Sequence, residues 1–342
     1  MTRVTDVFVC AGCETVLTVP VARVPLPPEA HHTYGHEFMP PLMAPGTYAV
    51  DPLPSGPPYR AWEEVSEAEA AAQGVFAPVH GVSFGPRGRV VIAPGDVRGT
   101  VLVPEQCNAY CCCGIAGGPE PNMACAACLL PVGSREDDCG LWSAVWFEPH
   151  AVRRVSTGAP APVRESERLS PIDPRGGWNP RWEAAAGAAL AHLLAASGGG
   201  PLTLPGGLVT QVFGPAVKTL LPAEGPVRRV GLAGPGVQAD GLDIALVPYG
   251  TPPPGDVAAV PLADGAWAWL ALPGETRPIP ASGTLPGGVL RDDYPLPDHP
   301  WRVLRPDRGA FLYTLARLPG VRSPWLRALY DRARTAPYGS VF

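Results

Sequence analysis

The sequence has almost no lysine and little charge of either sign. Lys218 is the only lysine among 342 residues, and charged residues make up 17% of the chain, below the ~25% common in soluble proteins. Disorder driven by charge is therefore not expected. The net charge of −5 provides no bulk attraction for a phosphate backbone, so nucleic acid is not favoured as a partner.

Long hydrophobic runs are also missing. No stretch approaches the ~20 apolar residues of a membrane helix, and the N-terminus lacks the basic start and apolar run of a signal peptide. We therefore expect a cytoplasmic chain without a membrane-spanning segment. Because thiols stay reduced in that compartment, cysteines there indicate metal ligation rather than disulfides.

Cysteine is absent from the C-terminal two hundred residues, since all nine cysteines lie between positions 10 and 139. The segment 156–178 is rich in proline, serine and charge. These features predict a first domain at 1–155, a linker at 156–178 and a second domain at 179–342. The 46 prolines and 40 glycines argue against long helices and favour short strands joined by turns.

Local patterns predict an α+β fold. In the first domain we expect strands at 4–9, 89–93, 99–104 and 145–147, and a helix at 66–73 that Ser66 and Glu69 cap. In the second domain we expect a helix at 180–196 after Asn179, strands at 227–233, 242–247, 257–261 and 267–272, and closing helices at 308–318 and 324–334. The last strand would place Trp267 and Trp269 on one face.

Familiar catalytic motifs are missing, because the chain has neither a Walker loop nor a G-x-S-x-G elbow. Gly234, Gly236 and Ala239 match G-x-G-x-x-A. Strand-like residues follow them at once, where a dinucleotide site needs a helix, so we predict a turn between two strands.

A histidine-rich segment invites a metal interpretation. His31, His32 and His36 precede or flank Glu37, but prolines crowd the segment and the order is not that of a zinc protease. We interpret the segment as a polar surface loop.

Two C-x2-C pairs are the strongest motifs in the chain. Cys10 and Cys13 form one pair, and Cys125 and Cys128 form the other. Each pair can direct two sulfurs at one metal, and four thiolates complete a closed tetrahedral Zn²⁺ site. Because the pairs lie far apart in sequence, we expect the residues between them to form a sheet or insertion whose ends are joined by the zinc ion.

Five cysteines remain, namely Cys107, Cys111, Cys112, Cys113 and Cys139. One alternative is a local site that combines some of the 107–113 cysteines with Cys125 and Cys128. A second metal is another alternative, held by Cys139 or the 111–113 run, with Asp137, Asp138 or His36 nearby and an open coordination position. Cys139 by itself is interpreted as an ordinary packed cysteine.

Several phrases carry a resemblance to a known family, namely VFVCAGCETVLT, GTYAVDP, VVIAPGDVRGTVLVPEQC, YCCCG, GPEPNMACAACLLPVGSREDDCGLW and VWFEPHAVRR. Over residues 7–154 the chain resembles uncharacterised actinobacterial proteins with paired C-x2-C motifs. It departs from them by its three consecutive cysteines and by GPEPN in place of GPN. The resemblance implies zinc ligation by Cys10, Cys13, Cys125 and Cys128 and implies no activity.

The spacing is also similar in kind to the zinc-pinned β-tent domains of the Yippee and cereblon type, although the pairs lie farther apart here and the Gly-Trp motif after the second pair is missing. We therefore expect a β-rich zinc-ribbon or β-tent-like first domain. A zinc ion closed by four sulfurs has no position for substrate, which favours a binding or adaptor protein with an unidentified protein or small-molecule partner. The alternative is an enzyme with an unrecognised site in the C-terminal domain or at the domain interface.

Overall fold

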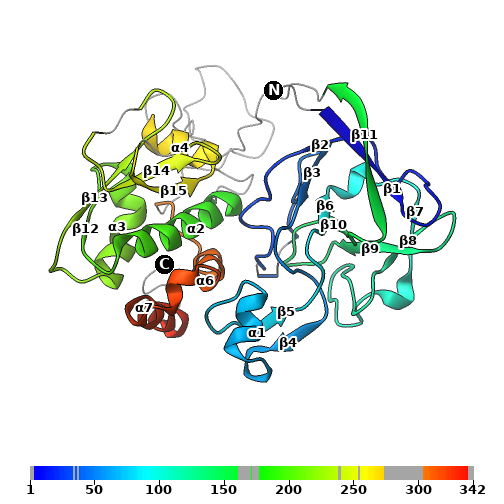
Figure 1. Cartoon of the computed structure of the whole chain (residues 1–342), viewed down its shortest axis with the longest axis horizontal. Helices are drawn as coiled ribbons and strands as arrows, with labels where there is room; N and C mark the ends of the chain where they lie inside the picture. Colours follow the sequence, from blue (N-terminus) through cyan, green and yellow to red (C-terminus); the bar gives the residue numbers. More distant parts are fainter. Residues whose placement is uncertain are drawn as a thin grey trace, which may run out of the picture. The chain divides into compact units, whose positions relative to one another are not determined.

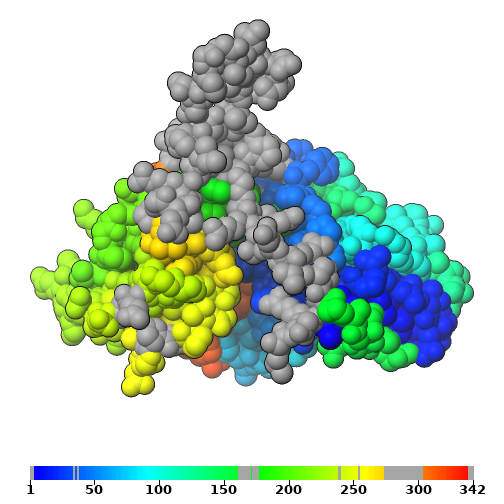
Figure 2. Space-filling view, turned by 90° about the horizontal axis from the view of Figure 1, so that it is seen from above, coloured from blue at the N-terminus to red at the C-terminus, as the bar shows by residue number. Residues whose placement is uncertain are grey.

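The computed structural model describes residues 4–33, 35–36, 38–160, 171, 177–237, 240–252, 255–272 and 303–337. The chain divides into two compact units, residues 1–165 and 166–342, and each is described by itself (Figure 1). In the space-filling view the described atoms of the first unit are coloured from blue through cyan to green, and those of the second from green through yellow to orange-red (Figure 2). In the described part of the chain, no helix combines the length and apolar character needed to cross a membrane. The predicted α+β class is confirmed.

A nine-stranded sheet forms most of the first unit. In pairing order its strands are β11 (Val152–Pro160), β1 (Val4–Cys10), β2 (Val21–Arg23), β3 (Thr47–Val50), β6 (Val90–Ile92), β10 (Ala144–Phe147), β9 (Pro131–Glu136), β8 (Met123–Cys125) and β7 (Thr100–Leu102). Only β2 and β3 pair in parallel; the other neighbours are antiparallel.

The middle strands of this sheet are buried on both faces, which explains their uninterrupted apolar runs. In β6, Val90 and Ile92 belong to one core cluster, and Val91 belongs to another. In β10, Phe147 faces the first cluster and Trp146 the second. Successive side chains of a strand point to opposite faces, so the sheet has a core on each side of these strands.

The sheet curls until its two ends meet. The strands β1 and β8 occupy the second and eighth places in the pairing order. Residues that follow β1 nevertheless bond to residues that precede β7: the N–H of Arg98 donates to the carbonyl of Leu17 at 2.8 Å, and the N–H of Val19 donates to the carbonyl of Asp96 at 2.9 Å. The C-terminal ends of β1 and β8 thereby face each other.

A small subdomain lies between β3 and β6. It contains β4 (Tyr59–Ala61), β5 (Gly81–Ser83) and α1 (Glu67–Ala72). The predicted capping box is present at the start of α1, where the Ser66 side chain accepts from the N–H of Glu69 and the Glu69 side chain accepts from the N–H of Ser66.

The second unit contains a parallel sheet with helices. Its strands, in pairing order, are β12 (Leu202–Thr203), β13 (Arg228–Leu232), β14 (Ile244–Pro248) and β15 (Ala258–Leu262). Its helices are α2 (Pro180–Ser197), α3 (Leu208–Leu220), α4 (Asp264–Ala271), α6 (Arg308–Ala316) and α7 (Pro324–Thr335). The alanine-rich α2 packs against β14, β15 and α6, and is largely buried.

One expectation needs correction here. The predicted strand at 267–272 is wrong, because Trp267 and Trp269 lie in α4, where both are buried and the Trp267 indole N–H donates to the carbonyl of Leu246 at 2.9 Å. In the first unit, β11 continues to Pro160 and so enters the segment predicted as a linker. The predicted turn after β13 is confirmed by the bridge between Gly234 and Val237, although the flanking strands pair in parallel; Ala239 lies outside the described residues.

Candidate metal centres

The two C-x2-C pairs adopt the same backbone conformation. After Cys10, the N–H of Glu14 donates to the Cys10 carbonyl at 2.9 Å, and after Cys125 the N–H of Leu129 donates to the Cys125 carbonyl at 2.9 Å. The fifth residue of each turn has a positive φ, 63° at Glu14 and 60° at Leu129. We call the segments 10–15 and 125–130 the first and second knuckles.

Each knuckle also closes with a second bond. The Cys10 N–H donates to the carbonyl of Thr15 at 2.8 Å, and the Cys125 N–H donates to the carbonyl of Leu130 at 2.9 Å. A left-handed conformation costs a residue with a β-carbon about 1–2 kcal/mol. Two unrelated sequences, Ala-Gly and Ala-Ala between the cysteines, therefore adopt the same unfavourable turn, which directs both sulfurs to one side.

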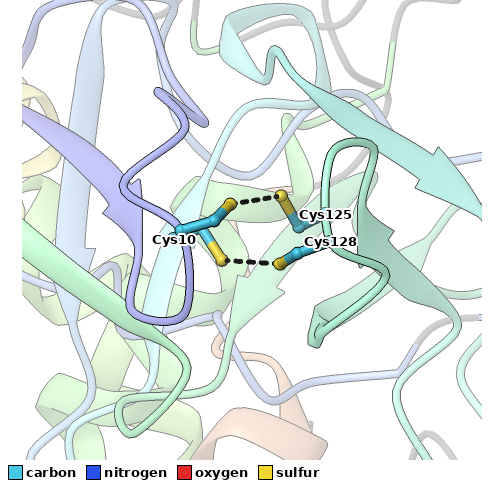
Figure 3. Close-up of side chains that lie close together, drawn as sticks. Cys10, Cys125 and Cys128 are labelled. Carbon is cyan, nitrogen blue, oxygen red and sulfur yellow. Dashed lines mark hydrogen bonds between the residues drawn. The ribbon is translucent and has the colours of Figure 1, made fainter.

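The four predicted cysteines come together where the ends of the sheet meet. Figure 3 shows Cys10, at the end of β1, pointing toward Cys125 and Cys128 of the second knuckle. The sulfurs of Cys10 and Cys128 are 3.6 Å apart, those of Cys13 and Cys125 are 3.6 Å apart, and all four lie within 4.8 Å of one another. A tetrahedral zinc ion with Zn–S bonds of ~2.3 Å needs sulfurs about 3.8 Å apart.

Burial divides this group, which we call the four-cysteine cluster, into an inner and an outer pair. Cys10 and Cys125 are both 0% exposed within the core, whereas Cys13 and Cys128 are exposed. The two knuckles are in close contact at Gly12, where a β-carbon would lie at van der Waals distance from the Cys128 sulfur, 3.6 Å, and from the Leu130 side chain, 3.5 Å.

Hydrogen bonds among the thiols shift their pKa values in opposite directions. Hydrogen bonds with Thr15 lower the pKa of the Cys13 thiol to about 6. The Leu130 N–H lowers the pKa of Cys128, but the neighbouring thiol of Cys13, burial and the remaining sulfurs outweigh it and raise that pKa to about 12. Without a cation, therefore, the Cys13 thiolate forms readily and opposes ionisation of the Cys128 thiol. A divalent cation would favour the thiolate form of all four cysteines.

A second group of candidate ligands lies elsewhere in the first unit. It consists of His36, Cys112, Cys113 and Cys139, whose ligand atoms also lie within 4.8 Å of one another. We call it the histidine-cysteine cluster. All its members are exposed except Cys139, which is partly buried. Neighbouring thiols, Cys112 first, raise the pKa of Cys139 to about 12.

The two clusters lie at opposite ends of β9. The strand starts at Pro131 beside the second knuckle and ends at Glu136, three residues before Cys139. Six residues of strand span about 20 Å. The clusters are therefore separate candidate sites, and their donor sets are consistent with a metal ion.

The remaining cysteines belong to neither cluster. The Cys107 sulfur lies 3.9 Å from the carbonyl oxygen of Val103. Burial and the Asp138 carboxylate raise the pKa of the Cys111 thiol. The alternative of a local site required such cysteines to lie beside Cys125 and Cys128, and the structure does not bring Cys107 or Cys111 there.

The histidine segment is only in part the polar surface loop that we predicted: His36 is exposed, but His31 and His32 are not. His32 is 6% exposed. The His31 Nε2 atom lies 2.7 Å from the Asp51 carboxylate, and its ring stacks on Trp146 at 5.3 Å. His36 lies with the cysteines, and Glu37 is outside the described residues. The first part of the segment is buried because the residues that precede it pack against the apolar cluster around Trp146.

One carboxyl group of the first unit has a strongly shifted pKa. Burial raises the pKa of Glu136 to about 7, although the Gly117 N–H and the positive charge of Arg89 oppose the shift. The buried Arg89 pairs with Glu148 at 3.1 Å and lies over the ring of Trp146.

No protein-family model, curated protein or solved structure matches the chain.

Proposed function

We propose that this chain is a zinc-binding protein in which Cys10, Cys13, Cys125 and Cys128 hold a structural Zn²⁺ ion. The observation that carries the proposal is the pair of matching knuckles. Each accepts a left-handed residue and two backbone hydrogen bonds that aim its sulfurs at the other knuckle. Hydrophobic packing alone supplies no reason for the same strained turn to occur twice at one point.

The zinc ion joins the two ends of the curled sheet. It ties β1 to the β8–β9 turn across more than 110 residues of sequence. Four thiolates fill a tetrahedral site and leave no position for a water molecule or substrate, so the ion is structural. Its role is to hold the surface loops of the first unit in place, and the protein acts as a binding or adaptor protein for a partner.

Zinc analysis of the purified chain tests this proposal. The Cys10→Ser variant should lose at least one equivalent of zinc relative to the wild type, because it removes a ligand from the long-range site. The matched control is Cys107→Ser, which changes a cysteine outside both clusters and should keep the wild-type content. Equal zinc in wild type and Cys10→Ser would refute the proposal.

An enzyme is the second candidate function, and one observation favours it. Catalytic carboxyl groups often have a raised pKa, as Glu136 does. A thermal-shift screen of small molecules against the wild type and Glu136→Gln tests this alternative. A compound that stabilises only the wild type would support a ligand site at Glu136, and a screen without such a compound would favour the adaptor function.

A further inference from the structure

The histidine-cysteine cluster joins three loops that are far apart in sequence. His36 comes from the connection between β2 and β3, Cys112 and Cys113 from the connection between β7 and β8, and Cys139 from the connection between β9 and β10. The Cys139 sulfur lies 3.0 Å from the Cys112 sulfur and 3.2 Å from Nδ1 of His36. The Cys113 sulfur lies 3.6 Å from the Cys112 sulfur. The same Nδ1 atom of His36 lies 3.8 Å from the Cys112 sulfur and 4.0 Å from the Cys113 sulfur.

These separations are close to those of a tetrahedral zinc site. Zn–S bonds of ~2.3 Å and Zn–N bonds of ~2.0 Å place the sulfurs about 3.8 Å from one another and about 3.6 Å from the imidazole nitrogen. The Cys112–Cys139 separation is the shortest of the sulfur pairs. It is shorter than the ~3.8 Å of a zinc site, so these two sulfurs must move apart when an ion binds.

Backbone contacts build the site independently of its thiols. The N–H of Ile115 donates to the carbonyl of Asp137 at 3.2 Å, and the N–H of Asp137 donates back at 2.6 Å. Gly114 makes this approach possible, because a β-carbon there would lie 2.0 Å from the Asp137 carbonyl oxygen. One oxygen of the Asp138 carboxylate accepts the N–H of Cys113 at 2.9 Å. The two cysteine-bearing loops are thus held together before any ligand is considered.

We propose that His36, Cys112, Cys113 and Cys139 form a second zinc site. Three thiolates and one neutral imidazole complete a closed tetrahedral site with a net charge of −1, whereas four thiolates give −2. Soft sulfur donors with one imidazole favour zinc over magnesium or calcium, which prefer oxygen. The proposal uses none of the ligands of the four-cysteine cluster and stands or falls separately from it.

The second zinc ion is exchangeable, because its ligands are at the surface. In the four-cysteine cluster, two of the sulfurs are completely buried in the core. In the histidine-cysteine cluster every ligand has contact with solvent, so a chelator can attack each metal–ligand bond. Loss of this ion releases the loop that carries His36 but leaves the strands paired and the two cysteine-bearing loops bonded to each other. The two sites therefore differ in function: one ion maintains the fold, and the other responds to the free zinc concentration.

Zinc content and release kinetics test the second site. The full chain, purified under reducing and anaerobic conditions, should contain about two equivalents of zinc. A chromogenic chelator should remove them in two phases of equal amplitude. The Cys139→Ser and His36→Ala variants should lose the fast phase and retain about one equivalent. Gly114→Ala should weaken the same phase, because its β-carbon separates the loops without changing a ligand.

The controls separate this proposal from the first one. Cys107→Ser should keep both phases, whereas Cys10→Ser should lose both, because the first unit that carries the histidine-cysteine cluster does not fold without the structural ion. One equivalent of zinc in the wild type, released in the slow phase alone, would overturn the second site, and this result does not depend on the folding of any variant. Peptide mapping that finds a Cys112–Cys139 disulfide in the reduced, anaerobic chain would also overturn it. A wild type that releases one equivalent of zinc in the fast phase alone would instead refute the four-cysteine site.

Discussion

The first unit consists of short strands arranged around two groups of cysteines, whereas the second unit buries an 18-residue, alanine-rich helix against a parallel sheet. The ends of the nine-stranded sheet meet at sulfur atoms, and the centre of the second unit is apolar. Phe213, Leu190 and Leu194 are each 0% exposed there. We infer that metal ligation supplies the closure in one unit and that apolar burial supplies it in the other.

Replacing a buried ligand should give the largest difference between the units. In Cys125→Ser, the first unit should fail to fold, because the zinc ion is removed and structural zinc sites contribute on the order of 10 kcal/mol to folding. The second unit should still unfold cooperatively. Hydrogen exchange resolved by peptide measures both units, and protection of β1 and β9 in Cys125→Ser would contradict the account.

A cavity in the second unit should have the opposite effect. Phe213 is fully buried in α3, and Phe213→Ala should lower the free energy of unfolding of that unit by about 3–5 kcal/mol. Denaturant titration should show an earlier transition for the second unit, and zinc analysis should show unchanged content. Loss of zinc from this variant would mean that the two units do not fold independently.

The pH dependence of stability should distinguish the units by a smaller amount. Because the pKa of Glu136 is raised to about 7 in the folded state, the folded chain binds a proton that the unfolded chain has released. The first unit should therefore lose about 1–3 kcal/mol of stability as the pH rises from about 4.5 to about 7. Zinc ligation strengthens over the same range, so the measurement is the difference between wild type and Glu136→Gln. The variant should gain stability relative to wild type as the pH rises; a pH-independent difference would contradict the raised pKa.

The smallest effect concerns the knuckle backbone. Leu129 has a φ of 60° and its side chain is 69% exposed. Leu129→Gly should stabilise the first unit by up to about 1 kcal/mol, because glycine adopts this conformation without steric cost. Leu129→Ala is the matched control and should give no gain, since it keeps the β-carbon. A gain of equal size in both variants would show that the exposed leucine, and not the backbone, is unfavourable.

Much of the local structure could be predicted from the sequence, because local signals determine it. Asn179 caps α2 as expected, with its side chain accepting from the N–H of Arg181. The helix α4 was missed for a physical reason. Its sequence, DGAWAWLA, alternates apolar and small residues as a strand does. The helix buries Ala266, Trp267, Trp269 and Leu270 on one face, but glycine and alanine occupy most of the other face, so no 3.6-residue period of polar residues marks it.

The two clusters differ in how far the sequence could predict them. A C-x2-C pair is a local unit, so the proximity of Cys10 and Cys13 to one metal position could be read from spacing. His36 lies more than 70 residues from Cys112, and adjacent cysteines match no standard ligand spacing. The sequence therefore allowed a second metal site near these residues without defining its ligands. Long-range strand pairing in the fold brings these ligands together, and local sequence patterns do not reveal that pairing.

Removal of zinc from the chain tests whether metal ligation closes the first unit. Calorimetric scans of the reduced full-length chain should be compared before and after exhaustive chelation, with hydrogen exchange to assign each transition to a unit. Chelation should abolish the transition of the first unit and leave that of the second unit unchanged, and restored zinc should reverse the effect. An unchanged transition in the first unit after zinc is lost, or the same displacement of both transitions, would contradict closure by metal ligation.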